Sequence, residues 1–462
     1  MWFLLSWNEG KMLGSDVYKF GGSSLASREA VDITARILAG STQANLAVVV
    51  SAPQGITNLL EEGVVRQNKT GTFPPRLFNQ LCSRFMEIYQ GVPYADHLVD
   101  CFKWDLEKGI DCYDGRQRTS DSLVLRKYRD RIVHLGEKTH HKLYANFLRE
   151  VYGLNATAVE PMALGLYVSD NFGNAKVWGI SYSNIAERLK DFSGIAVIPG
   201  FYGCTLDGDV ATFSRGGSDF TGAVVARGTG ASVYRNCTDV NGIKRIDPRI
   251  FNGQRDIQTI PYLSYREAQE LSILGAKVLH PNCIDPVREL GIPIEVRNTF
   301  DFDGEFTTIQ QDKPVNGKKV EAIATKKCLD FVVLESSDMF GESGFVEKFA
   351  HALAGVDVDM IYTSPVAIVA SFSSTDRLPE IASKLEEYGR VTSGREAAIV
   401  SIVGSGIDAI VMRDHYGALV KEDGSCYAVR RVTKPHELSL WTSVDPEYCD
   451  EIARRLFEVF CA

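Results

Sequence analysis

Short apolar runs that alternate with helical patterns constrain the fold of this chain more than any other feature. Residues 45–51 contain the run LAVVV, which turn residues bound on both sides. A run of this kind is typical of a strand buried on both faces of a parallel sheet. Further strand patterns lie at 16–20, 156–159, 194–199, 232–240 and 292–299, and helical patterns separate them. The sequence therefore predicts an α/β domain with a largely parallel central sheet.

The pattern changes near residue 318, where two weakly similar groups of short elements follow each other. The first group has strand patterns at 320–324, 329–334, 358–361 and 367–372 with a helix at 345–354, and the second has strands at 397–403 and within 426–441 with helices at 407–419 and 446–460. We therefore predict two small α+β modules. The predicted division is an extension at 1–15, a catalytic domain at 16–317, a first module at 318–395 and a second at 396–462.

Composition and charge exclude several classes of protein. The 462 residues carry a net charge of −9 without a long basic run, so neither a nucleic acid nor an anionic membrane is an expected partner. The ten cysteines are scattered and form no C-x-x-C motif, which favours reduced thiols over a zinc or thioredoxin-type site. The start of the chain lacks the long apolar region of a signal peptide, and no segment is apolar enough to span a membrane. We expect a cytoplasmic protein.

The first glycine motif follows the first strand pattern. Lys19 precedes the glycines Gly21 and Gly22, and a helix is expected to begin after Ser27. Glycines let the backbone approach an anion closely, a helix N-terminus offers free N–H groups, and lysine supplies a point charge for phosphate. The motif is not a Walker A loop. Taken alone, such a segment is more often only a turn before a helix.

A second motif, SRGGSD at 214–219, precedes a helix expected at 216–227. Arg215 can bind a substrate carboxylate at two points, and Asp219 can hold Mg²⁺ or orient a lysine. Ser218 or Asp219 can equally be an ordinary helix cap. From the residues alone, the two interpretations carry similar weight.

Two further segments suit either a ligand site or ordinary structure. The motif TDVNG at 238–242, followed by DPR at 247–249, predicts a strand that runs into a long turn. Ligands of open α/β sheets bind beyond such strand ends, although Asn-Gly and Asp-Pro also favour a plain surface turn. In GAKVLHP at 275–281 only Lys277 and His280 are not apolar, and we expect His280 to be structural.

Taken together, these motifs resemble the aspartate kinases, within the amino-acid kinase fold family. Six motifs match in order and spacing: KFGGSS at 19–24, SAPQGITNLL at 51–60, RGGSD at 215–219, TDVNGI at 238–243, DPR at 247–249 and GAKVLHP at 275–281. The resemblance is close from residue 16 to about 310 and looser beyond. It implies an amino-acid kinase fold followed by two ACT modules of ferredoxin-like α+β type.

The resemblance also implies an activity and its substrates. An aspartate kinase transfers the γ-phosphoryl group of ATP, with Mg²⁺, to the β-carboxylate of L-aspartate. The product, 4-phospho-L-aspartate, leads toward lysine, threonine and methionine. Because the carboxylate is already a nucleophile, no strong general base is needed, and catalysis consists of aligning two anions and neutralising their repulsion.

The roles implied by the resemblance fall on three groups of residues. The catalytic pair is Lys19, which bridges the transferring phosphoryl group, and Asp219, which orients Lys19 or Mg²⁺. The implied aspartate-binding residues are Ser51, Thr57, Glu137 (for the α-amino group), Phe201 (through its backbone), Arg215 (for the α-carboxylate) and Ser218. The implied ATP-binding residues are Lys19, Gly21, Gly22, Ser23, Thr238, Asp239, Asp247 and Lys277. No metal ligand is assigned to the protein itself.

The C-terminal modules imply feedback control by an amino-acid effector at the interface of a homodimer or a dimer of dimers. The implied effector residues are Met339, Glu342, Phe345, Asp359 and Ser364. In the family one module is threaded through the other, so the strand at 320–324 is a candidate member of the second module. Glu342 and Pro365 depart from the lysine-inhibited relatives, which leaves the effector open. Lys244 and Cys237 stand where many relatives carry an aromatic residue, which implies a different packing of adenine.

Two alternatives to an aspartate kinase remain open from the sequence. One is a sister amino-acid kinase that acts on another carboxylate, such as that of glutamate. The other is a catalytically silent subunit that senses an effector through its ACT modules. Since Lys19, Glu137, Arg215 and Asp219 are all present, the silent subunit ranks last.

Overall fold

The computed structural model describes two compact units. The described residues are 16–461 without 44, 113–121, 215, 277–278, 315–318, 340–343, 357, 374, 420–428 and 437–438. The first unit contains the described residues up to 243 together with 261–265 and 278–313, and the second contains 244–260, 266–277 and the residues from 314 onward. The units thus divide close to the predicted boundary at 317, but two segments within the predicted catalytic domain group with the second unit.

A buried ion pair explains why one of these segments belongs to the second unit. The guanidinium of Arg245 lies 3.6 Å from a carboxylate oxygen of Glu321 and donates to the Glu321 carbonyl at 2.9 Å. In return, the Ile323 N–H donates to the Arg245 carbonyl at 2.7 Å. Because both charged side chains are nearly inaccessible to solvent, separating them would leave an uncompensated charge in the interior. The segment at 244–260 is therefore held to the strand that follows residue 321.

The first unit is built on the predicted parallel sheet. Its strands are β1 (Val17–Phe20), β2 (Leu46–Val50), β3 (Ala156–Ala158), β4 (Ile195–Pro199), β7 (Tyr234–Thr238), β8 (Tyr262–Ser264), β9 (Ile294–Asn298) and β10 (Thr307–Gln310). They lie in the order β3-β4-β2-β1-β7-β9-β10-β8, and every pairing is parallel except that of β9 with β10. The sheet confirms the predicted α/β class. A separate hairpin, β5 (Tyr202–Cys204) and β6 (Val210–Thr212), was not predicted.

The helices of the chain up to residue 288 agree broadly with the predicted helical segments. They are α1 (Arg28–Ala39), α2 (Ile56–Thr70), α3 (Pro75–Tyr89), α4 (Ala95–Asp111), α5 (Ser122–Val133), α6 (Leu135–Glu150), α7 (Pro161–Leu164), α8 (Ile180–Leu189), α9 (Gly217–Thr229), α10 (Tyr265–Ile273) and α11 (Ile284–Arg288). Ser27 caps α1 as predicted, since its side chain accepts a hydrogen bond from Ala30 N–H. Helices α5 and α6 meet at His134. None of the described helices is both long and apolar enough to cross a membrane.

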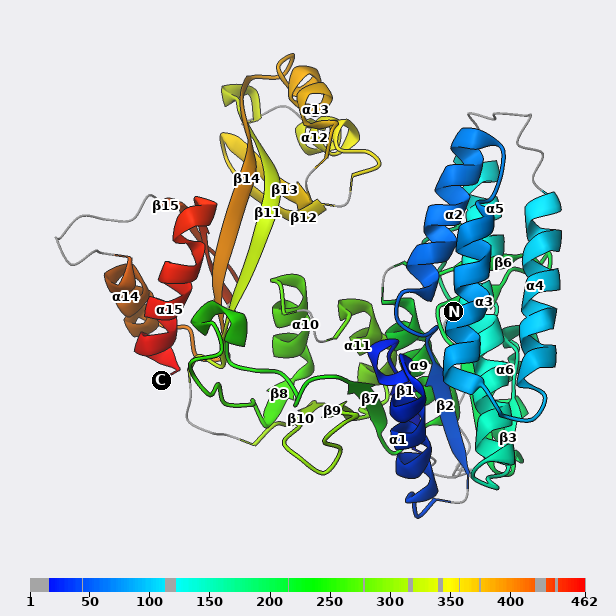
Figure 1. The fold of residues 1–462 in the computed structure, drawn as a ribbon. Coiled ribbons are helices and arrows are strands. Elements are labelled where there is room, and N and C mark those ends of the chain that lie inside the picture. Colours follow the sequence, from blue (N-terminus) through cyan, green and yellow to red (C-terminus); the bar gives the residue numbers. More distant parts are fainter. Residues whose placement is uncertain are drawn as a thin grey trace, which may run out of the picture. The chain divides into compact units, whose positions relative to one another are not determined.

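Helices cover the two faces of the sheet differently. Tyr18 and Phe20 of β1 pack into a large core with residues of α1 and α6, whereas Tyr234 of β7 reaches α9 and donates to the Asp219 carbonyl at 2.9 Å. Since side chains alternate along a strand, Lys19 faces the α9 side. In Figure 1 helices α2 to α6 stand together beside the sheet.

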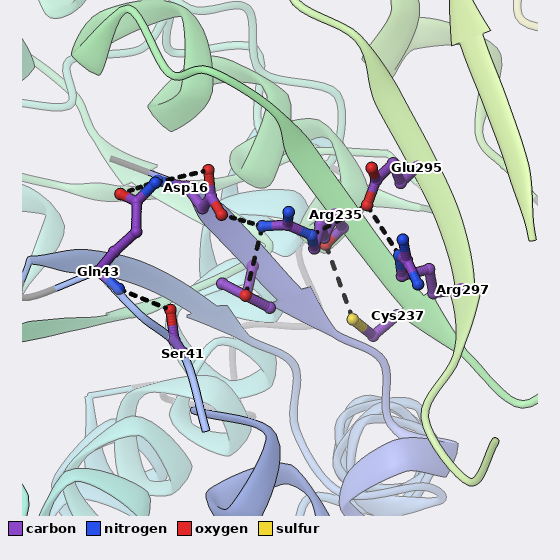
Figure 2. Close-up of polar contacts among 8 residues, drawn as sticks. Asp16, Ser41, Gln43, Arg235, Cys237, Glu295 and Arg297 are labelled. Carbon is purple, nitrogen blue, oxygen red and sulfur yellow. Dashed lines mark hydrogen bonds and ion pairs between the residues drawn. The ribbon is translucent and has the colours of Figure 1, made fainter. Parts of the chain in front are cut away.

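On the face opposite Lys19, a network of paired charges ties three strands together. Figure 2 shows Arg235 of β7 between Asp16, which precedes β1, and Glu295 of β9, whose carboxylate lies 2.9 Å from the guanidinium. Arg297 reaches the same Glu295 oxygen at 2.8 Å. The network holds two cations and two carboxylates, so its charges balance within a half-buried setting. The network thereby holds β1, β7 and β9 side by side, on the face of the sheet opposite to Lys19.

The second unit is a single six-stranded antiparallel sheet with two cores. Its strands are β11 (Ala322–Glu335), β12 (Val358–Ser364), β13 (Ala367–Ser373), β14 (Arg390–Val403), β15 (Val429–His436) and β16 (Ser439–Val444), in the order β12-β13-β11-β14-β16-β15. Its helices beyond residue 340 are α12 (Phe345–Ala352), α13 (Leu378–Leu385), α14 (Ala409–Ala418) and α15 (Cys449–Phe460). Figure 1 shows β11 and β14 side by side, with α12 and α13 near one end and α14 and α15 near the other.

The two long strands belong to both ACT modules. The residues of β11 from 329 onward pair with β13, and Val332 and Leu334 lie in the core that contains α12 and α13. The residues of β11 from 322 to 326 pair with 399–403 of β14, and Ile323 packs with α14 and α15. The first strand of the predicted 318–395 region thus completes the second module. A bulge between Lys326 and Leu329, with Cys328 at φ 59°, separates the two parts of β11.

Candidate active site

Several sequence-predicted site residues come together where the parallel strands of the first unit end. Lys19 lies near the end of β1, Ser51 directly follows β2, Phe201 lies two residues beyond β4, and Thr238 ends β7. These four strands are neighbours in the order β4-β2-β1-β7. The carboxyl edge of an open parallel sheet is the usual place for a ligand, because strand ends leave loops and helix N-termini there. Helices α6 and α9 supply the remaining side chains.

The centre of the site is an ion pair between Lys19 and Asp219. The Lys19 ammonium lies 2.5 Å from a carboxylate oxygen of Asp219, which stands in the first turn of α9. The two side chains are only 9% and 16% exposed, so water screens their attraction poorly. Asn236 of β7 lies directly opposite Lys19, and its Oδ1 is 3.4 Å from the ammonium. Lys19 is therefore held from both a helix and a neighbouring strand.

The predicted phosphate loop has glycines where a side chain would not fit. A Cβ atom at Gly22 would lie 2.9 Å from the Ala52 carbonyl oxygen, and one at Gly21 would lie 3.1 Å from the Lys19 ammonium nitrogen. The Gln54 N–H donates to the Gly22 carbonyl at 3.0 Å. The loop after β1 thus packs tightly against the loop after β2. Ser23 begins a short 3₁₀ helix, where free N–H groups face the same edge.

On the other side of Lys19, a pair of hydroxyls joins the loop after β2 to α9. The Ser51 and Ser218 hydroxyl oxygens lie 3.0 Å apart. A Cβ atom at Gly200 would lie 2.6 Å from the Ser218 side chain, so the end of β4 also approaches α9 closely. Thr57 stands half-buried in the first turn of α2. The structure therefore brings three predicted substrate-binding segments into one place.

Glu137 is the least solvated carboxylate of this group. It is 2% exposed in the first turn of α6, where the Ala52 backbone N–H donates to it. Its Oε2 atom has no hydrogen-bond partner among the described residues. Burial disfavours the charged form and raises the pKa of Glu137 to about 8. An arriving ammonium group would supply the partner that this oxygen lacks.

Phe201 has a strained backbone at this site. Its φ of 77° lies in the left-handed region, which bulky residues rarely adopt. The Phe201 N–H donates to the Thr221 hydroxyl at 3.1 Å, and the Phe201 carbonyl accepts from Phe213 N–H at 2.8 Å. A backbone contact to a ligand would therefore fall to the second lone pair of the carbonyl oxygen.

The predicted nucleotide-binding residues are distributed over both units. Thr238 and the exposed Asp239 end β7 in the first unit, with 3.1 Å between their side-chain oxygens. Asp247 belongs to the second unit, where its carboxylate caps a short helix by accepting from Arg249 N–H at 2.9 Å. Arg215 and Lys277 lie outside the described residues. Only some of the predicted nucleotide-binding residues therefore lie at the carboxyl edge of the sheet in the first unit.

Two residues that stand where many relatives carry an aromatic residue, Cys237 and Lys244, lie in well-defined surroundings. Cys237 is fully buried in the core on the side of α1 and α6, and burial raises the pKa of its thiol to about 12. It therefore faces away from Lys19, which lies on the α9 side. Lys244 belongs to the second unit and donates to the Thr259 hydroxyl at 2.8 Å.

The predicted effector residues lie in the first ACT module of the second unit. Phe345 begins α12 with its ring buried in the core of the module, and Met339 packs at the edge of the same core. Asp359 of β12 lies 2.5 Å from the Lys326 ammonium, and the Ser364 hydroxyl donates to the Ala367 carbonyl at 3.4 Å. Glu342 lies outside the described residues.

The sequence interpretation missed two residues that contact the site. Asn236 was included only in a strand pattern, although a polar residue within a buried strand is a signal that could have drawn attention to it. His140, three residues after Glu137, bonds to the Ser51 carbonyl at 2.7 Å, and the sequence interpretation gave it no role. The available signal was a group of histidines close together in the sequence, of which His134 precedes α6 and His140 and His141 lie within it.

The described residues offer no ready-made metal cage. No group of three or more histidine, cysteine, aspartate or glutamate side chains among them is arranged to hold a metal ion. Mg²⁺ commonly binds through one or two carboxylates together with substrate phosphates and water. Asp219 beside the phosphate loop fits that pattern of binding.

Comparisons with known proteins show the family to which the chain is similar. The sequence pattern of the amino acid kinase family matches residues 17–298. Aspartokinase 3 of Bacillus subtilis (strain 168) is 33% identical over 359 residues, which cover 74% of this chain and 76% of that protein. Lysine-sensitive aspartokinase 3 of Escherichia coli (strain K12) is 28% identical over 84% of this chain and 87% of its own length. The crystal structure of E. coli aspartokinase III in complex with aspartate and ADP superposes with a TM-score of 0.81 at 25% identity, covering 97% of this chain and all of that one.

Proposed function

The chain belongs to the amino acid kinase family and, within it, to the aspartokinases, and on that premise we propose that its first unit phosphorylates L-aspartate. The γ-phosphoryl group of ATP passes to the β-carboxylate. A bond forms between a carboxylate oxygen and the γ-phosphorus while the bond to the ADP oxygen breaks. The products are ADP and 4-phospho-L-aspartate. The observation that carries the proposal is the desolvated Lys19–Asp219 ion pair beside the glycine loop.

In this proposal Lys19 neutralises the transferring phosphoryl group, and Asp219 orients the lysine. Gly21, Gly22 and Ser23 admit the phosphates to the backbone of the loop. A cation is essential at this point because two anions must approach each other in line. Mg²⁺ bound together with ATP would supply further charge neutralisation, and Asp219 is the residue that would face it.

The aspartate occupies the side of the site formed by α6, α9 and the loop after β2. Glu137 accepts the α-ammonium group, for which its unpartnered Oε2 atom is suited. Arg215 binds the α-carboxylate, and Ser51 and Ser218 add hydrogen bonds from their paired hydroxyls. Thr57 and the Phe201 carbonyl complete the aspartate site. Thr238, Asp239, Asp247 and Lys277 bind the nucleotide.

The ACT modules regulate this reaction through an amino-acid effector and a dimer interface. Asp359 supports a cationic effector, since its Oδ2 is buried without a partner among the described residues while Oδ1 holds Lys326. Strand β12 ends the six-stranded sheet, and the side chains of Ile361 and Val366 near this edge are more than half exposed. Such an edge suits pairing with a second copy of the chain. A homodimer or a dimer of dimers follows, with a mass that light scattering would measure.

A cytoplasmic location fits the chemistry of the thiols. The nine described cysteines are all free. Three of them, Cys101, Cys112 and Cys328, are exposed to solvent, where an oxidising compartment would promote disulfide formation.

The decisive experiment is ATP turnover with Mg²⁺ in which hydroxylamine traps the acyl phosphate. Reactions with aspartate, with glutamate and without an amino acid are compared, each with and without lysine and threonine. We expect hydroxamate only with aspartate, and lowered turnover with the effector that the ACT modules bind. Hydroxamate from glutamate instead of aspartate would indicate a sister kinase, and folded protein that gives none would indicate a silent sensing subunit.

A further inference from the structure

We propose that His140 is a positioning residue for the aspartate site, acting through the peptide that joins Ser51 to Ala52. The proposal rests on the proposed function, because it concerns the same substrate. It begins from a buried chain of three groups: the Tyr89 hydroxyl lies 2.7 Å from His140 Nε2, and His140 Nδ1 lies 2.7 Å from the Ser51 carbonyl oxygen. Tyr89 and His140 are completely buried.

The direction of these hydrogen bonds follows from the chemistry of the three groups. A carbonyl oxygen can only accept, so His140 Nδ1 must carry a proton and donate to Ser51. Burial lowers the pKa of His140 to about 3 and raises that of Tyr89, so the ring is neutral and the phenol keeps its proton. In a neutral ring the second nitrogen accepts, and Tyr89 therefore donates to His140 Nε2. The chain of bonds runs in one direction, from Tyr89 to Ser51.

The bond from His140 acts together with a second bond from the same helix. Glu137, one turn earlier on α6, accepts from the Ala52 N–H. Helix α6 thus donates to the carbonyl of residue 51 and accepts from the amide of residue 52, which fixes two successive backbone groups. The orientation of this short segment cannot change without breaking one of these buried bonds.

The fixed segment at residues 51 and 52 lies between α9 and the phosphate loop. The Ser51 hydroxyl lies 3.0 Å from that of Ser218 at the start of α9, and the Ala52 carbonyl oxygen would lie 2.9 Å from a Cβ atom at Gly22 of the phosphate loop. Its position therefore sets the distance between the Glu137 carboxylate and the Ser51–Ser218 hydroxyls, which the proposed function places around the same amino acid. His140 itself touches no substrate, so its effect should appear in the binding of aspartate.

The test compares variants of one buried helix in the full-length protein. His140→Leu removes the donor to Ser51 and keeps the volume apolar, whereas His140→Asn keeps a donor near the position of Nδ1. Tyr144→Phe is the matched control, since it removes one buried hydroxyl bond of α6, to Thr34 at 2.9 Å, away from Ser51. We expect His140→Leu to raise the KM for aspartate about tenfold and to change the KM for ATP less than about twofold.

We expect His140→Asn to restore the KM for aspartate to within about threefold of the unmodified protein, and Tyr144→Phe to leave it unchanged while it lowers the melting temperature. A His140→Leu protein with the original KM for aspartate would overturn the proposal. An equal rise in the KM values for both substrates would also overturn it, because it would reveal a general loss of packing. A protein without any aspartate-dependent turnover would instead contradict the proposed function.

A spectroscopic measurement tests the hydrogen-bond chain without any activity. Nitrogen-15 NMR of labelled histidine should show that the ring whose signal shifts in Tyr89→Phe is neutral and protonated at Nδ1, and that its signal stays unchanged from pH 8 to pH 5. If no such ring shifted in Tyr89→Phe, or if the ring that shifts were protonated at Nε2 or titrated near the ordinary pKa of about 6.5, the result would contradict the chain. This measurement tests the hydrogen bonds from Tyr89 to Ser51 even if the His140→Leu variant does not fold.

Discussion

The phosphoryl side and the aspartate side of the candidate site differ in how their charged groups are paired. On the phosphoryl side, Lys19 and Asp219 are both charged and lie 2.5 Å apart. On the aspartate side, Glu137 is buried without a cationic partner, and its raised pKa of about 8 keeps it largely protonated at neutral pH. The first side is thus assembled before substrate arrives, whereas the second becomes charged only when it receives an ammonium group.

This difference has a physical cause in how each carboxylate is surrounded. Asp219 has the Lys19 ammonium 2.5 Å from its carboxylate, whereas buried Glu137 has backbone N–H donors but no cation among the described residues to balance a negative charge. A ligand that brings a positive charge compensates Glu137 and is selected by it. A ligand without an amino group would leave the carboxyl protonated and its oxygen unpaired.

The largest expected effect comes from removing the cation of the phosphoryl side. Lys19→Ala removes the cation that faces the transferring phosphoryl group, so we expect kcat to fall on the order of 10²–10³-fold with little change in the KM for aspartate. Steady-state kinetics of hydroxamate formation measures both constants. Lys142→Ala serves as a control, since it removes a lysine of α6 whose ammonium pairs with Glu160 at 2.8 Å. A loss below about fivefold in kcat would remove Lys19 from the phosphoryl site.

Replacing the buried carboxyl of the aspartate side should lower activity less, and it should change the KM for aspartate rather than kcat. Glu137→Gln keeps the size of the side chain but cannot become an anion, so the substrate ammonium loses its counter-charge. We expect the KM for aspartate to rise about 10–100-fold while the KM for ATP stays within about twofold. An unchanged KM for aspartate in this variant would show that the amino group binds elsewhere.

The pH dependence of aspartate binding sharpens the comparison further. The anionic form of Glu137 binds the ammonium group, and its raised pKa of about 8 means that binding at lower pH must expel a proton. We therefore expect the KM for aspartate to fall as pH rises, by about eightfold between pH 7 and pH 8.5, and to level off above the pKa. The Glu137→Gln variant should lose this dependence. A flat profile in the unmodified protein would mean that Glu137 is already charged.

Much of the phosphoryl side could be predicted from the sequence, because its residues occur in short motifs with local physical meaning. Lys19 with its glycines, and Asp219 at a helix start, each carry a recognisable chemistry. The α/β class followed from the apolar strand runs in the same way. The polar Asn236 within a buried strand was a local signal, but its contact with Lys19 could not be predicted because it depends on the register between two distant strands.

The aspartate side was harder to predict in detail, because its geometry depends on the tertiary packing of α6. The family resemblance pointed to Glu137, but nothing in the sequence revealed that His140 would hold the Ser51 carbonyl. The same limit explains the segment 244–260, which follows a catalytic motif in sequence yet groups with the ACT sheet through the buried pair of Arg245 and Glu321. The sequence offered no means of pairing these two residues across 76 positions.

The smallest expected effect concerns Asn236, the neutral member of the charged side. Its Oδ1 lies 3.4 Å from the Lys19 ammonium, and its Nδ2 is buried without a partner among the described residues. We expect Asn236→Leu to lower kcat about two- to fivefold, since Lys19 keeps its ion pair with Asp219 but loses its second contact. Asn236→Asp should lower kcat more, although it binds Lys19 more strongly, because an added anion opposes the incoming phosphates. If Asn236→Asp were more active than Asn236→Leu, a firmly held Lys19 would matter more than the total charge around it. The proposed difference between the phosphoryl side and the aspartate side would then be wrong.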